Sequence, residues 1–141
     1  MTITNVTSET FSQQVLNSDV PVVVDFYAEW CHPCHQMAPV LNALSQEHEG
    51  RVRFTKVNID EEPELARAYR ISSIPAVLLF DSGAPTAWSL GPKPGYVLEK
   101  ELGLARARNR RAGSGGVAAG DAEARQQRGV LTALKSWWGS Q

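Results

Sequence analysis

Runs of apolar residues along the first hundred positions have the length and composition of β-strands. The clearest is residues 20–27 (VPVVVDFY), a nearly unbroken apolar and β-branched run. A strand buried on both faces has this composition. Four further strands are expected at residues 3–6, 51–59, 76–80 and 86–90.

Between these runs, apolar residues recur at helical spacing. Residues 31–48 are the clearest helix, because Met37, Leu41 and Leu44 follow the helical period and Gly50 comes after the end. Pro39 lies inside this helix and predicts a kink. Shorter helices are expected after a Ser8 N-cap, from Pro63, and from Pro94 to Leu102 before Gly103.

Helices alternate with strands in the order β-α-β-α-β-α-β-β-α. This order predicts an α/β fold with a central mixed β-sheet flanked by helices. The pattern ends near residue 104, so residues 1–104 are expected to form one domain.

Residues 105–141 differ in composition from this domain. The domain holds 7 basic and 13 acidic residues, a net charge of −6, whereas the tail holds 7 basic and 2 acidic residues, a net charge of +5. Residues 105–129 are rich in Ala, Arg and Gly and predict a disordered tail. Its end predicts a short amphipathic helix, with an apolar stripe formed by Val130, Leu131, Leu134, Trp137 and Trp138.

Several roles remain open for this basic tail. It could contact anionic lipid, nucleic acid or acidic proteins, or end in a small membrane anchor. The simplest interpretation is a tail whose tryptophans fold back loosely on the domain. Translation of GC-rich coding sequence in a shifted frame would also produce such a composition. For the protein as a whole, we expect no nucleic-acid partner.

The composition of the chain is that of a soluble globular protein, with 43% hydrophobic and 21% charged residues. No targeting segment or membrane span is visible, so a cytoplasmic location is expected.

The two cysteines lie three positions apart, and a bond between them closes too short a loop to add much stability. In the cytosol such a pair favours catalysis or metal binding.

The cysteine pair lies where the central strand gives way to a helix. A helix N-terminus offers free N–H groups and partial positive charge, which stabilise a thiolate. We therefore expect Cys31 to be the attacking sulfur. Cys34, one turn inside the helix and expected to be better covered, would resolve the mixed disulfide. Pro33 suits the first helical turn.

Together with the cysteine motif, several separate segments resemble the thioredoxin family. Residues 24–31 (VDFYAEWC) lead into the motif, and the later segments follow in the family's order: residues 37–39 (MAP), 56–60 (KVNID), 73–75 (SIP) and Gly91. The similarity covers roughly residues 3–104 and implies the thioredoxin fold. It also implies a redox-active Cys31–Cys34 disulfide.

The resemblance assigns further residues to the site. It places the family's buried carboxylate at Asp25, where a raised pKa would let it take the proton of Cys34. It places the neighbouring lysine at Lys56. The alternative for Asp25 is a strand-end aspartate exposed to water, but its neighbours in VVVDFY are apolar on both sides and argue against that. Without the resemblance, Lys56 would be read as an ordinary surface lysine.

By the same resemblance, an apolar groove beside the cysteines binds substrate. Pro75 matches the family's cis-proline, whose loop pairs with extended substrate backbone. Trp30, Ile74 and Gly91 match the rest of the groove. The alternative for Trp30 and Ile74 is ordinary core packing.

The sequence departs from the family next to the cysteines. His32 replaces the usual glycine, and an imidazole that favours the Cys31 thiolate would make the couple more oxidising. The alternative is that His32 points into solvent and changes little. His35, Ala76 and Pro92 also differ from the usual residues and put the choice of substrate in doubt.

The cysteine motif has three other possible interpretations: haem attachment, a structural zinc site and a binding module. Residues 31–35 (CHPCH) match a c-type haem attachment pattern, but no export signal is visible and no distal ligand is obvious. Structural zinc would need a second ligand pair, so we expect no metal. A third alternative is a binding module, such as a chaperone or assembly subunit, that uses the groove without turnover.

The resemblance therefore implies a protein-disulfide oxidoreductase that reduces disulfides of cytosolic client proteins. It implies no bound cofactor, with reducing equivalents supplied by NADPH through a flavin-dependent thioredoxin reductase. We expect a monomer. A more oxidising oxidase or isomerase remains an alternative.

Overall fold

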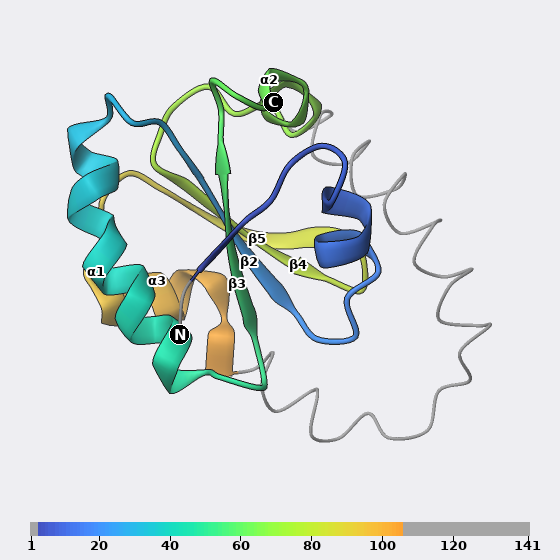
Figure 1. Cartoon of the computed structure of the whole chain (residues 1–141). Helices are drawn as coiled ribbons and strands as arrows, with labels where there is room; N and C mark the ends of the chain where they lie inside the picture. The colour runs from blue at the N-terminus through green and yellow to red at the C-terminus, as the bar shows by residue number, and fades with distance from the viewer. Residues whose placement is uncertain (1–2, 106–141) are drawn as a thin grey trace.

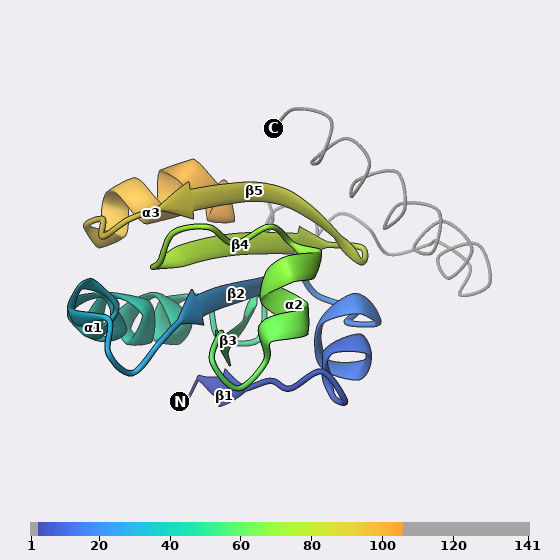
Figure 2. The same cartoon turned by 90° about the horizontal axis from the view of Figure 1, so that it is seen from above.

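A mixed β-sheet forms the centre of the protein. In this computed structural model residues 3–105 are described. Five strands lie in the order β1-β3-β2-β4-β5 (Figure 2). The strands are β1 (Thr4–Asn5), β2 (Val22–Tyr27), β3 (Arg53–Asn58), β4 (Ala76–Asp81) and β5 (Ala84–Leu90). Strands β1, β3 and β2 are parallel, whereas β4 is antiparallel to β2 and to β5.

Helices cover both faces of the sheet (Figure 1). They are the π-helical η1 (Ser12–Leu16), α1 (His32–Glu47), α2 (Pro63–Ala68) and α3 (Gly95–Leu102). Helices α1 and α3 lie on one face, and η1 and α2 lie on the other. The predicted α/β thioredoxin fold, with its mixed sheet and its order of elements, is confirmed.

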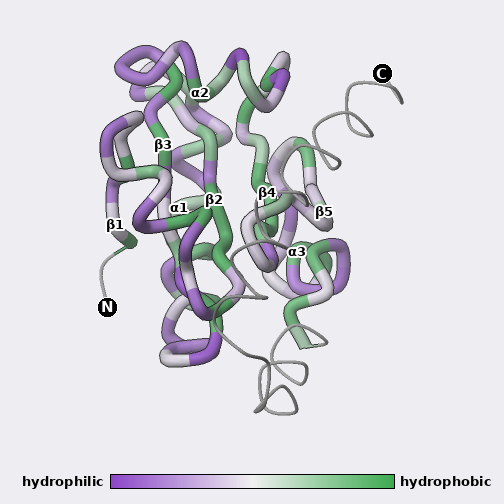
Figure 3. Tube along the Cα trace, turned by 90° about the vertical axis from the view of Figure 1, so that its right-hand side faces the viewer, coloured by the Kyte–Doolittle hydropathy of each residue, from purple (hydrophilic) through white to green (hydrophobic). Residues whose placement is uncertain are grey.

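The alternation of side chains along β2 divides the core into two layers. Val23 packs with Met37 and Leu98 under α1 and α3, whereas Val24 and Phe26 pack under η1 and α2. Because helices cover both faces of the sheet, the central strands β2 and β4 are apolar almost throughout (Figure 3).

The first helix begins later than the sequence predicted. Ser8 is not its N-cap, because η1 begins at Ser12 after Phe11. Thr7 and Thr10 instead exchange hydrogen bonds between their side chains and each other's backbone amides. The Ser8 amide donates to Glu62 Oε1 over 2.6 Å, a long-range contact that the local pattern could not reveal.

Helix α1 continues through Pro39 as one helix and ends at Glu47, with His48 as its C-cap. Helix α3 ends at Gly103, whose φ of +65° is the left-handed conformation of a helix C-cap. Leu104 is fully buried in the core beyond it.

None of the described helices has the length and apolar character needed to cross a membrane. The predicted disordered tail and its amphipathic end lie outside the described residues.

Candidate active site

The two cysteines lie at the start of α1 and are joined as a disulfide, with their Cα atoms 5.3 Å apart. Cys31 is the N-cap, and its Sγ accepts a hydrogen bond from the Cys34 amide over 3.3 Å. Pro33 occupies the first turn, as predicted. A sulfur held at the free N–H groups of a helix is stabilised as a thiolate.

The expectation that Cys34 is better covered than Cys31 is wrong for this oxidised state. The two residues are 5% and 4% exposed, respectively, because both pack into a small cluster with Ala28 and Ile74. The assignment of roles therefore depends on position in the helix. The Cys31 sulfur receives an amide at the helix end, whereas Cys34 lies within the helix.

Asp25 is a buried carboxylate in the middle of β2. It is 7% exposed and follows Val23 on the face of the sheet that α1 covers. Burial raises its pKa from 3.8 to about 7, and the positive charge of Lys56 opposes this shift. Within residues 3–105, no group donates a hydrogen bond to its Oδ1. Asp25 can therefore exchange a proton near neutral pH.

Lys56 lies beside Asp25, because the two residues are direct partners in the β2–β3 ladder. It is half-buried, and its Nζ lies 5.4 Å from the centroid of the Tyr27 ring. Contact with an aromatic face holds a cation in place. The sequence alone would make Lys56 a surface residue, and its partial burial beside Asp25 departs from that interpretation.

Trp30 is 69% exposed, so it is not a core residue. Its Nε1 donates a hydrogen bond to Asp60 Oδ2 over 2.8 Å. This bond fixes the ring against the loop after β3 and leaves its apolar surface open beside Cys31. Sequence reasoning missed Asp60, because its partner lies 30 positions away.

Ile74, Pro75 and Gly91 lie together near the cysteines. The Ile74–Pro75 bond is cis, and Ile74 packs against the cysteine cluster. The Gly91 amide donates to the Pro75 carbonyl over 2.8 Å. Gly91 has a φ of +82°, a conformation that residues with a side chain rarely adopt.

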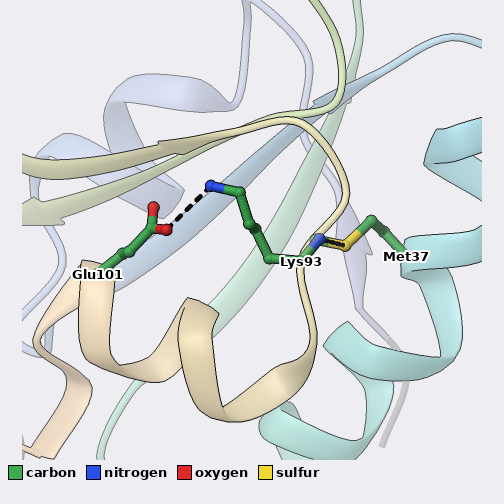
Figure 4. A network of polar contacts seen from close by, with 3 residues as sticks. All are labelled: Met37, Lys93 and Glu101. Atoms are coloured by element: carbon green, nitrogen blue, oxygen red, sulfur yellow. Dashed lines mark hydrogen bonds and ion pairs between the residues drawn. The ribbon is translucent and has the colours of Figure 1, made fainter.

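The segment after Gly91 is held from two sides, as Figure 4 shows. The Lys93 amide contacts Met37 Sδ in α1 at 3.2 Å, and Lys93 Nζ pairs with Glu101 Oε1 in α3 at 2.9 Å. The bond to Lys93 is the main cause that lowers the pKa of Glu101. These contacts hold the segment that follows Gly91 against α1 and α3.

The two histidines of the motif differ in their surroundings. His32 is exposed on the first turn of α1. His35 Nε2 lies 2.6 Å from the Glu29 carbonyl. Since a carbonyl only accepts, this nitrogen carries the proton. The bond ties the first turn of α1 to the loop before Cys31, a contact that sequence reasoning did not foresee.

The chain was compared with known proteins. The model of the Thioredoxin family matches residues 2–103. Thioredoxin 1 of Nostoc is 45% identical over 97 residues, which are 69% of this chain and 91% of that protein. Thioredoxin of Porphyra purpurea is 40% identical over 102 residues, 72% of this chain and 95% of that protein. Thioredoxin of Rickettsia bellii is 49% identical over 79 residues, 56% of this chain and 75% of that protein.

Proposed function

The chain belongs to the thioredoxin family and is a thiol–disulfide oxidoreductase, and from this premise we propose that it reduces disulfides of cytosolic client proteins through Cys31 and Cys34. The observation that carries the proposal is a disulfide at a helix N-terminus, together with a buried carboxylate of pKa about 7 in the strand that precedes this helix. A binding module would not need a proton acceptor poised at neutral pH.

The first step is attack by the Cys31 thiolate on a client disulfide. A bond forms between Cys31 Sγ and one client sulfur while the client S–S bond breaks, and the second client sulfur leaves and takes up a proton. The amide groups at the start of α1 favour the thiolate that attacks.

The second step releases the client. Asp25 takes the proton of Cys34, and the resulting thiolate attacks Cys31 Sγ. The mixed disulfide breaks, and the client sulfur leaves as a thiol. The client has then gained two electrons and two protons, and the protein holds the Cys31–Cys34 disulfide. Lys56, beside Asp25, stabilises the carboxylate in its charged form.

Clients would bind across the apolar surface beside the disulfide. The exposed Trp30, the half-buried Ile74 and the rim at Gly91 support this proposal, because an extended chain could lie on them and pair with the backbone near Pro75. We further propose that NADPH, through a flavin-dependent thioredoxin reductase, restores the dithiol, and that the protein acts as a cytoplasmic monomer without a bound cofactor.

Reduction of insulin disulfides coupled to NADPH oxidation by a thioredoxin reductase tests the proposal. The full chain should turn over, and Cys31→Ser should not. Turnover with dithiothreitol but not with the reductase would reject the proposed electron donor but would still support the proposed reduction of client disulfides. An inactive full chain with both donors would reject the proposed function.

A further inference from the structure

A second cluster of ionisable side chains joins the end of α1 to α3, through contacts separate from those of the disulfide. It consists of Glu47, His48 and Glu99. His48 is 1% exposed, and its Nε2 lies 2.7 Å from Glu99 Oε1. One donor atom from each of the three residues lies within 4.8 Å of the others. The sequence predicts no metal site, and no local pattern reveals this cluster, because His48 and Glu99 are 51 positions apart.

The short contact between the His48 imidazole and the Glu99 carboxylate needs a proton or a metal ion between the two atoms. An imidazole lone pair and a carboxylate oxygen repel each other at 2.7 Å unless a proton or a metal ion lies between them. With a neutral imidazole, two carboxylates leave the cluster with a charge of −2. A divalent ion in place of the shared proton would balance that charge.

His48 is buried, and its Nδ1 has no hydrogen-bond partner among the described residues. The contact with Glu99 is therefore the polar contact that orients the ring, and Nε2 is the ring nitrogen that faces the carboxylates.

Space for the ion and its water ligands lies next to the cluster. Glu47 and Glu99 line a hollow of about 330 Å³ between α1 and α3, together with Val40, Ala43, Leu44, Gly95 and Tyr96. Ligand atoms around tetrahedral zinc are about 3.3 Å apart, as bond lengths of about 2.0–2.1 Å require. Small rotations of the accessible Glu47 and Glu99 would reach that spacing from the one observed.

We propose that Glu47, His48 and Glu99 form a binding site for a single Zn²⁺ ion that clips the end of α1 to α3. One imidazole and two carboxylates are ligands typical of zinc, and water completes the coordination. The imidazole disfavours Mg²⁺ and Ca²⁺, which prefer oxygen ligands.

Calorimetric titration of the oxidised, chelator-treated full chain with Zn²⁺ tests the proposal, because the disulfide keeps both thiols from binding the metal. We expect one site. Glu47→Gln, which does not touch the His48–Glu99 bond, should weaken Zn²⁺ binding at least about tenfold, and Glu47→Gln with Glu99→Gln should abolish it. Glu49→Gln, an exposed neighbour outside the cluster, should leave it unchanged.

A second readout detects the clip itself. Zn²⁺ should raise the thermal midpoint of the full chain and of Glu49→Gln but not that of the double variant. Three outcomes would overturn the proposal: no Zn²⁺ binding, Mg²⁺ binding of equal strength, or Zn²⁺ binding that survives in the double variant. The last would place the ion elsewhere, for example at the exposed His32 and His35.

Discussion

Asp25 shows at the residue scale how a functional group opposes stability. The folded protein raises its pKa to about 7, whereas the unfolded chain has the ordinary value of 3.8. Between these two values the folded state holds more protons than the unfolded state. The contribution of Asp25 to the free energy of unfolding therefore falls as the pH rises through this window.

Replacement of Asp25 by asparagine should remove that penalty. We expect Asp25→Asn to increase the free energy of unfolding by up to about 4 kcal/mol at pH 8 and by much less at pH 4. Urea unfolding of the oxidised protein at both pH values measures the difference. Equal effects at both values would show that the Asp25 carboxyl does not titrate in this window.

The same variant should slow the release of the client. Without the Asp25 proton acceptor, attack by Cys34 on the mixed disulfide should slow by roughly one to two orders of magnitude at neutral pH, whereas the first attack by Cys31 should change little. Rapid-quench measurement of the mixed disulfide separates the two steps. An unchanged second step would remove Asp25 from the mechanism.

His32 is the residue that we expect to tune the couple. His32→Gly should shift the reduction potential toward about −270 mV, because a group that favours the Cys31 thiolate is lost. Equilibration against glutathione gives the value. His35→Gln, whose amide can still donate toward the Glu29 carbonyl, is the matched control and should shift it less. Identical potentials for the full chain and His32→Gly would make His32 a bystander.

At the scale of elements, the turn after β5 contributes to stability through the backbone conformation of Gly91. Gly91→Ala should destabilise the protein by about 1–2 kcal/mol, because alanine disfavours the left-handed conformation at φ +82°. Gly95→Ala, in the first turn of α3, should be neutral or stabilise the protein slightly, since alanine favours a helix over glycine and its Cβ would lie an ordinary 3.7 Å from Val40. Urea unfolding compares the two variants, and similar losses would contradict this account.

The elements also show where sequence reasoning succeeds. The apolar run of β2 and the helical period of α1 predict these elements within two residues, because each buries a continuous surface. The start of η1 was not predicted in this way, because η1 has Phe11 as its N-cap and no side-chain cap bond, whereas the predicted cap Ser8 bonds the distant Glu62. The equal burial of the two cysteines likewise depends on Ile74, which arrives from a distant loop.

For the whole molecule, the core closes with Leu104. Among the described residues Leu104 is the last buried one, and the family match ends at residue 103, so both observations are consistent with the predicted end of the domain at residue 104. We predict that a chain shortened after Ala105 keeps the thermal midpoint and the client turnover of the full chain. Differential scanning calorimetry and the insulin assay measure both. A loss of either would assign the tail a role in the fold or in the reaction.

Contacts between segments that are distant in the chain explain which features of the site the sequence could not predict. The motif segments at residues 24–31, 56–60 and 73–75 and Gly91 fall at or next to the ends of strands, whereas residues 37–39 lie inside α1. The bonds from Trp30 to Asp60 and from His48 to Glu99 join distant segments, and no local pattern carries them. Of the site residues named by resemblance, Ile74 packs against the cysteines and Gly91 is bonded to the neighbouring Pro75. The roles of the named residues remain predictions.

The most direct test of the account is the mass of the covalent species formed with a disulfide-bonded peptide. Cys34→Ser should accumulate a mixed disulfide in which the peptide is bound to Cys31, because the resolving thiol is gone. Cys31→Ser should accumulate none at neutral pH. A peptide trapped on Cys34 in the Cys31→Ser variant, with none trapped on Cys31 in the Cys34→Ser variant, would reverse the assigned roles and contradict the mechanism.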